Sequence, residues 1–392
     1  MRIVQIADTH LGISINEYSL YIDQLHFLNT LRERLKEIKP EVILVSGDVF
    51  DSSQPKDDAL KLYDEFINVL AASPEVKAVF IIQGNHDPRE FLRTYTEQLR
   101  KLHIYVTSKF DGLKGYPVED EYGTVIFYPL PYIRPSVLTG AEGFLQESER
   151  DNIKSYADAV TYILQHTEVD QSVRNVLLCH QWIEGALKSD TERSYVGGSE
   201  EIPKDIFGDY DYVAVGHLHN AKTIKSGNTV IRYSGTPVPY SFQEAKTKRS
   251  ISLVELGPKG TELQLTEIEI VPLHQLRELK GSYTELLSDS LRDTYAQGGN
   301  NYLLRIVLTD TNLVSDVRQS LKNLYPNMIA FDRETHLDNV TNTEIKTIEE
   351  LTQLDPMEAF TDLYRQALHM DMTEEERVLA QEIIESIFKK GA

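Results

Sequence analysis

The sequence predicts a layered α/β fold, followed by a smaller α/β unit and terminal helices. Short apolar, β-branched runs alternate with longer amphipathic stretches through the first two thirds of the chain. Continuous apolar strands between helices are typical of a sheet that is covered on both faces. The length of 392 residues is enough for two to three domains, because a domain averages roughly 150 residues.

The expected elements of the first domain follow from these runs. Eight runs are predicted to be strands, at residues 2–7, 41–46, 78–83, 125–130, 175–179, 212–215, 229–233 and 250–256. Three stretches between them have apolar side chains at helical spacing, at residues 18–38, 57–71 and 91–102. We expect one large domain over residues 1–270.

A second unit is expected at residues 271–335. Its predicted strands are 276–279, 302–308 and 328–332, and its predicted helices are 283–295 and 313–324. Residues 336–392 are expected to form a linker and two helices. The first helix begins at Asp355-Pro356 and the second at the capping box Thr373–Glu376. These helices either pack on their own domain or dock on another chain.

Composition and charge restrict the classes of protein. No apolar run is long enough to span a bilayer, and the single cysteine, Cys179, cannot form an internal disulfide, so we expect a cytoplasmic protein. The net charge of −21 argues against nonspecific binding to nucleic acid.

Five short polar segments each follow an apolar strand directly. They are Asp8-Thr9-His10, Gly47–Asp51, Gly84–Asp87, Cys179-His180 and Gly216–His219, and they hold five of the eleven histidines. In an open α/β sheet, the loops at the carboxyl ends of the strands converge on one crevice. Residues far apart in the sequence are therefore expected to meet there.

The residue types in these segments fit a pair of metal ions. The candidate ligands supply oxygen and imidazole donors without thiolate, which suits Mn²⁺, Fe, Zn²⁺ or Co²⁺ better than Ca²⁺. They are Asp8, His10, Asp48, Asn85, His180, His217 and His219. Seven ligands are too many for one ion with an open position, so we expect two ions, with Asp48 as the shared ligand. Within an extended segment, Asp8 and His10 would face the crevice together, as would His217 and His219.

Such a pair of ions stabilises the attacking and leaving oxygens of phosphoryl transfer. His86 is then free to bind the phosphate or to protonate the leaving oxygen. Asp51 is expected to orient the His86 imidazole by a hydrogen bond.

Together these segments resemble the calcineurin-like metallophosphoesterases, whose pattern is D-x-H, G-D-x-x-D, G-N-H-[DE], a lone His and G-H-x-H. The resemblance implies a β-sandwich flanked by helices and a small capping domain. It implies one metal held by Asp8, His10, Asp48 and His219. It implies the other held by Asp48, Asn85, His180 and His217, with Asp51 and His86 as a carboxylate–histidine pair.

Within that superfamily the chain resembles the SbcD family of nuclease subunits. The resemblance lies in Ile6–Gly12, Gly84–Pro88, Gly216–His219 and Ser234–Pro237, then in Ser241-Phe242 and Glu244. It implies a Mn²⁺-dependent exonuclease and endonuclease acting on DNA ends and hairpins in repair and recombination. It also implies a homodimer within a heterotetramer, whose C-terminal helices bind a coiled-coil ATPase of the SbcC type.

Other interpretations remain open at this point. The same motifs fit a metallophosphoesterase for nucleotides or phosphoproteins, or a non-catalytic scaffold of the same fold. The apolar stripe within 91–102 could pack on the sheet or form a dimer interface, and Lys246–Arg249 could contact DNA or form a solvated turn. Cys179 is expected in the core, because its neighbour His180 faces the crevice. Because of the acidic balance, we expect the isolated chain to bind long duplex DNA weakly.

Overall fold

A computed structural model of the chain describes residues 1–140, 145, 150–186, 200–296, 301–310 and 316–334. Between 356 and 384 the structure also describes residues 356–357, 360–361, 364, 372–373, 377–381 and 384, and all of these except 372–373 are helical. The predicted C-terminal helices otherwise lie outside the described residues. Among the helices described, none is both long and apolar enough to cross a membrane.

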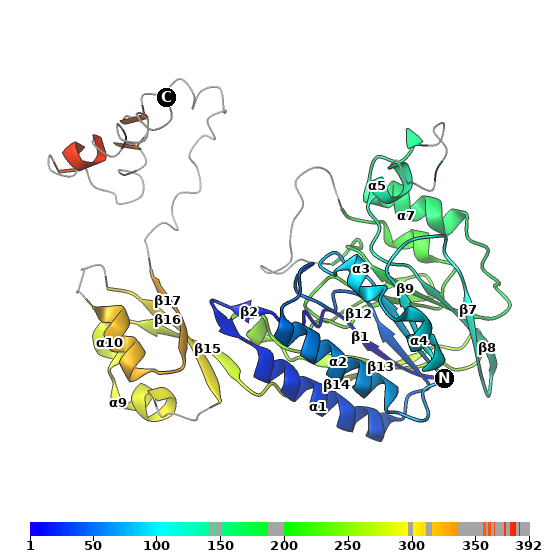
Figure 1. Ribbon diagram of the computed structural model, residues 1–392, viewed down its shortest axis with the longest axis horizontal. Helices are drawn as coiled ribbons and strands as arrows, with labels where there is room; N and C mark the ends of the chain where they lie inside the picture. Colours follow the sequence, from blue (N-terminus) through cyan, green and yellow to red (C-terminus); the bar gives the residue numbers. More distant parts are fainter. Residues whose placement is uncertain are drawn as a thin grey trace.

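The first domain is built from two six-stranded sheets (Figure 1). In spatial order the first sheet contains β14 (Gln264–Glu269), β13 (Ser250–Glu255), β1 (Arg2–Ile6), β4 (Val42–Val45), β5 (Ala78–Ile82) and β6 (Ile104–Thr107). The second contains β11 (Lys222–Ser226), β12 (Thr229–Tyr233), β10 (Tyr212–Gly216), β9 (Arg174–His180), β8 (Gly123–Pro129) and β7 (Tyr116–Asp120).

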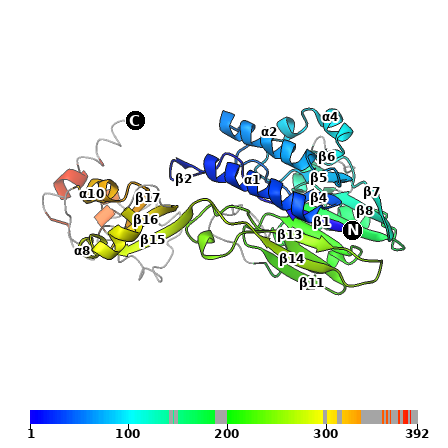
Figure 2. The ribbon, with the colours of Figure 1, turned by 90° about the horizontal axis from the view of Figure 1, so that it is seen from below.

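The two sheets pack face to face, and helices cover their outer faces. Alternate residues of a strand point to opposite faces, so Leu44 lies in the core between the sheets while Ile43 lies under the helices. The helices α1 (Tyr21–Ile38) and α2 (Asp57–Ala71) lie along the first sheet (Figure 2). The helices α5 (Pro135–Thr139) and α7 (Tyr156–Gln165) share a core with the second. The β-sandwich flanked by helices is therefore confirmed.

Residues 275–333 form a smaller unit with its own apolar core. Its sheet consists of three parallel strands, β15 (Gln275–Gly281), β16 (Tyr302–Leu308) and β17 (Met328–Arg333). The helices α8 (Tyr283–Leu286), α9 (Asp289–Leu291) and α10 (Val317–Leu324) accompany it. The hairpin of β2 (Ser14–Ile15) and β3 (Tyr18–Ser19) lies beside α10 and β17, and together they line a cavity of about 710 Å³.

Several predicted helices differ from the structure. The helix expected at 18–38 begins at Tyr21, after the β2–β3 hairpin. The helix expected at 91–102 is divided into α3 (Arg89–Leu92) and α4 (Thr96–Lys101), because Tyr95 between them has a left-handed φ of 60°. The helix expected at 283–295 is likewise broken into α8, α9 and a π-helical turn at Arg292–Ala296.

Candidate metal centre

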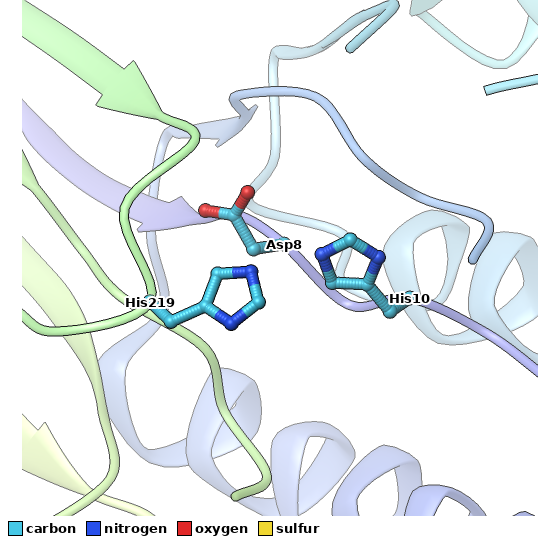
Figure 3. A group of neighbouring side chains, drawn as sticks. All are labelled: Asp8, His10 and His219. Atoms are coloured by element: carbon cyan, nitrogen blue, oxygen red, sulfur yellow. The ribbon is translucent and has the colours of Figure 1, made fainter. Parts of the chain in front are cut away.

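The five polar segments meet at one end of the sandwich. Asp8 follows β1, Asp48 follows β4, and Asn85 and His86 follow β5, all in the first sheet. His180 ends β9, and the segment with His217 and His219 follows β10 in the second sheet. Asp8, His10 and His219 face one another across the boundary between the sheets (Figure 3). Convergence of the strand ends, as predicted, brings these side chains together.

The backbone is not extended at four of these residues. Asp8, His10, Asp48 and His217 have φ values of 52°, 39°, 49° and 99°. A left-handed conformation costs a non-glycine residue about 1–3 kcal/mol and is found mainly where function requires it. The assumption that residues two apart share a face of an extended segment was therefore wrong, although the side chains do meet.

The carboxylate of Asp48 lies at the centre of the cluster. Its Oδ2 is 3.3 Å from Nε2 of His180, 3.8 Å from Nε2 of His10 and 4.0 Å from Nε2 of His86. Its Oδ1 accepts a hydrogen bond of 2.8 Å from the main-chain N–H of His86. Asp48 therefore lies near histidines on both sides of the cluster, which is the position expected of a ligand that two metal ions share.

Buried acceptors face one another here in a way that calls for a cation. Nδ1 of His180 lies 2.8 Å from the main-chain oxygen of Ser46, so that nitrogen carries the hydrogen. Nε2 of the same ring faces two oxygens, Oδ1 of Asn85 at 2.9 Å and Oδ2 of Asp48 at 3.3 Å. A neutral imidazole would place its lone pair against both acceptors. A proton or a metal ion is needed at that position.

The surroundings of His10 indicate a bound cation more strongly still. The residue is 2% exposed, and neither ring nitrogen has a hydrogen-bond partner among the residues that the structure describes. A buried unsatisfied polar atom is costly. One ligand atom from each of Asp8, His10 and His219 lies within 4.8 Å of the others, and the same holds for Asp8, Asp48 and His180. Both groups of donors fit a divalent cation. In the first group, the ring nitrogens of His10 are available to bind that cation.

The acid–base properties of the cluster reflect burial of many charges. Burial raises the pKa of Asp8 to about 7. Burial would also raise the pKa of Asp48, but the adjacent His180, His10 and His86 outweigh it and hold that pKa well below its ordinary value. Burial lowers the pKa of His10 well below its ordinary value, so this imidazole is neutral, which is the form that binds metal.

His86 lies at the edge of the cluster, and its side chain is 10% exposed. Its Nδ1 is 2.9 Å from the main-chain oxygen of Asp51. The expected hydrogen bond to Asp51 therefore goes to the peptide carbonyl instead of the carboxylate, whose Oδ1 lies 3.8 Å from Nδ1 of His10. Because a carbonyl only accepts, Nδ1 of His86 carries a hydrogen and Nε2 faces the cluster.

Sequence reasoning missed the residues that support these segments. Gln24 of α1 donates to the main-chain oxygens of Thr9 and His10 and accepts from the N–H of Gly12. Glu244 accepts a hydrogen bond of 2.9 Å from Nδ1 of His219. Gln24 gives no motif signal because it lies within an amphipathic helix. Glu244 contributes to the resemblance to the SbcD family, but the motif alone predicts no role for it.

The structure also shows the surroundings of Cys179 and Arg249. Cys179 is fully buried in the core behind the second sheet, as expected, and burial raises the pKa of its thiol. Arg249 is 4% exposed and binds the main-chain oxygens of His219 and Glu244. Arg249 therefore stabilises the segment that carries His219 and is not available to contact DNA. For the exposed Lys246 and Lys248, contact with DNA stays a prediction.

The two-sheet fold and the buried carboxylate–histidine cluster define a metal-dependent phosphoesterase. A family model described as calcineurin-like phosphoesterase matches residues 1–221, and one described as type 5 capsule protein repressor C-terminal domain matches residues 272–367. The SbcD subunit of the SbcCD nuclease from Staphylococcus saprophyticus is 30% identical over 362 residues, covering 91% of this chain and 92% of that protein.

The solved structures that this chain resembles share less of its sequence. A dimetal phosphatase from Danio rerio is 11% identical with a TM-score of 0.42, over 69% of this chain and 96% of that one. An archaeal phosphodiesterase is 14% identical with a TM-score of 0.34, over 69% and 99%. From the family model and the sequence relative, the chain belongs to the calcineurin-like phosphoesterases and, within them, to the SbcD family.

Proposed function

We propose that the chain is the nuclease subunit of a DNA-processing complex and that it cleaves phosphodiesters with two divalent ions, Mn²⁺ being the expected metal. The observation that carries this proposal is the position of Asp48, whose Oδ2 lies within 4.0 Å of imidazole nitrogens on both sides of the cluster. Such a carboxylate can serve two cations at once. The sequence relative, named as a nuclease subunit, supports DNA as the substrate.

In this proposal each ion has its own ligands. Asp8, His10, Asp48 and His219 would hold one, and Asp48, Asn85, His180 and His217 would hold the other. When bound, the two cations supply the charge that stabilises the anionic transition state and acidifies the attacking water. The protein keeps the ligands buried and pre-oriented, so little reorganisation is needed during the reaction.

His86 has the geometry of a proton donor. Its Nδ1 is committed to the carbonyl of Asp51. Its Nε2 lies 4.0 Å from Oδ2 of Asp48. The protonated ring would bind a phosphate oxygen or transfer a proton to the leaving oxygen, help that is worth about 10²–10⁴-fold in rate.

The partners follow from the same family membership. We propose that the C-terminal helices bind a coiled-coil ATPase of the SbcC type in the cytoplasm and that two nuclease subunits pair within the complex. DNA ends and hairpins would be the substrates, in repair and recombination. With a net charge of −21, the chain would depend on its partner for most of its affinity for long duplexes.

Two variants test the assignment of roles. We expect His86→Gln to bind Mn²⁺ as wild type does but to cleave a labelled hairpin about 10²–10⁴-fold more slowly. Asp48→Asn is expected to lose both metal and cleavage. Metal content by mass spectrometry and digestion of a hairpin and a linear duplex check both. Full cleavage by either variant would contradict the proposal, and Lys36→Gln on the exposed face of α1 is the matched control.

A further inference from the structure

A short segment after β8 runs between the two groups of ligand loops. The main-chain N–H of Leu130 donates to Leu178 in β9, and that of Tyr132 donates to Gln83, just before the loop that carries Asn85. On the other side, the side-chain amide of Gln181, next to His180, donates to the carbonyl of Ile133 at 3.0 Å. Residues 130–133 are therefore held by hydrogen bonds to the segments on both sides of the cluster.

The side chain of Tyr132 fills the space beside two ligand imidazoles. It is 8% exposed, and its ring centroid lies 6.0 Å from that of His180 and 6.4 Å from that of His217. The rings of Tyr132 and His217 are tilted by only 22°. The tyrosine thus forms a rigid wall of the site on the His180–His217 side.

Arg134 lies on this wall and is exposed. Its guanidinium carbon is 5.5 Å from the centroid of the Tyr132 ring, within the range of a cation–π contact. The main chain of Arg134 is fixed as well, because its carbonyl accepts the N–H of Val137 at the start of α5. An exposed guanidinium group therefore stacks on the tyrosine that lies beside two of the proposed ligand imidazoles.

We infer that Arg134 binds a phosphate of the substrate strand next to the one being cleaved. This inference rests on the proposed nuclease function and extends it to a second point of contact. The guanidinium group is suited to bidentate contact with a phosphate, and stacking on Tyr132 reduces the conformational freedom lost on binding. The Tyr132 ring lies 6.4 Å from the His217 ring and 5.5 Å from the guanidinium carbon of Arg134, which places the guanidinium outside the metal cluster itself.

The contact has a consequence that separates large substrates from small ones. A diester such as bis(p-nitrophenyl) phosphate has one phosphate and cannot reach Arg134 while it occupies the metals. An oligonucleotide has a neighbouring phosphate, which can reach Arg134 while the phosphate to be cleaved lies at the metals. The arginine should therefore contribute to KM for DNA and contribute nothing to hydrolysis of the small diester.

The test compares Arg134→Gln and Arg134→Lys with wild type in Mn²⁺, on a single-stranded oligonucleotide, a linear duplex and bis(p-nitrophenyl) phosphate. Arg34→Gln, an exposed arginine of α1 that pairs with Glu37, is the control for the change in net charge. We expect Arg134→Gln to raise KM for both DNA substrates about tenfold, with kcat and small-diester hydrolysis within twofold of wild type. Arg134→Lys should recover part of the loss, because it keeps the charge without the bidentate geometry.

The salt dependence gives a second readout that a purely structural role would not change. Loss of one phosphate contact should reduce the slope of log(kcat/KM) against log[KCl] by about 0.7–0.9. Equal losses on DNA and on the small diester, or a DNA KM and salt slope that match those of Arg34→Gln, would overturn the assignment of Arg134. If the wild-type protein hydrolyses the small diester but no DNA, the proposed nuclease function fails instead.

Discussion

At His219, a single carboxylate sets the orientation of the imidazole. Oε1 of Glu244 lies 2.9 Å from Nδ1 of His219, and Oε2 accepts the main-chain N–H of Tyr240 at 2.9 Å. Glu244 is 1% exposed, so both contacts are shielded from water. The carboxylate fixes the hydrogen on Nδ1, which leaves Nε2 as the donor for a metal and increases its basicity.

We therefore expect Glu244→Gln to weaken Mn²⁺ binding about 10–100-fold, which is the usual cost of removing a partner of a ligand histidine. Calorimetric titration of the metal-free protein with Mn²⁺ measures the effect. Glu269→Gln is the control, because Glu269 pairs with Lys248 on the surface. Unchanged affinity in Glu244→Gln would show that His219 is oriented by other contacts.

Residue types and spacing were enough to predict which side chains gather at the site, but not how the backbone places them. Asp8 and His10 meet the other ligands through left-handed φ values, which no sequence pattern indicates for these residue types. The peptide carbonyl of Asp51, and not its carboxylate, contacts His86. Main-chain acceptors are present in every residue, so the sequence cannot show which one is used.

At the scale of the element, the strand β10 ends at a glycine because the two sheets come very close there. A Cβ on Gly216 would lie 2.0 Å from the main-chain oxygen of Ser46 and 2.7 Å from Nδ1 of His180. Neither group can move freely, since each is hydrogen-bonded to the other at the centre of the site. The glycine thus permits the hydrogen bond that orients His180.

Gly216→Ala is accordingly expected to lower the free energy of unfolding by about 1–3 kcal/mol, the cost of overpacking a tight site. It should also reduce bound Mn²⁺. Urea denaturation and metal analysis check the two effects. Gly208→Ala provides the comparison, because the nearest atom to its Cβ would be 3.6 Å away. Wild-type stability and metal content in Gly216→Ala would contradict the proposed close approach.

The predicted elements agree with the structure best where the strands are buried on both faces. The central strands β1, β4, β5, β9 and β10 read as continuous apolar runs and were found. The edge strands β6, β7, β11 and β14 were missed. The last three expose many of their residues and carry charges, whereas β6 is only four residues long. Their pairing depends on tertiary neighbours, which outweigh local strand propensity.

At the scale of the whole molecule, Arg174 at the start of β9 joins the two sheets. Its guanidinium binds both carboxylate oxygens of Asp120 in β7 and the main-chain oxygens of Gly123 and of Leu256, just after β13. Arg174 is 1% exposed. Burial would raise the pKa of Asp120, but the hydrogen bonds from Arg174 and from the ammonium group of Met1 hold it well below its ordinary value.

A carboxylate with a depressed pKa stabilises the folded state above the pKa of the unfolded chain, roughly 4, and that stability is lost as the pH falls toward the folded-state pKa. We expect Asp120→Asn to cost about 3–5 kcal/mol at pH 7, because it leaves a buried arginine without its partner. The variant should also lose less stability than wild type between pH 5 and pH 3. Urea denaturation across that range tests both statements.

The matched control is Asp111→Asn, since Asp111 forms an exposed pair with Lys114. It should behave as wild type at every pH. Equal acid sensitivity of Asp120→Asn and wild type would show that other carboxylates govern the acid transition.

The pairing of β1 with β13 has a consequence for how the molecule is made. Ile3 is in register with Val254, so β1 is synthesised long before β13, its antiparallel partner. Asp8 and His10 extend directly from that unfinished strand. A nascent chain therefore carries all seven proposed ligand side chains before it has the complete sheet that positions them, and we expect metal to bind late in synthesis or after release.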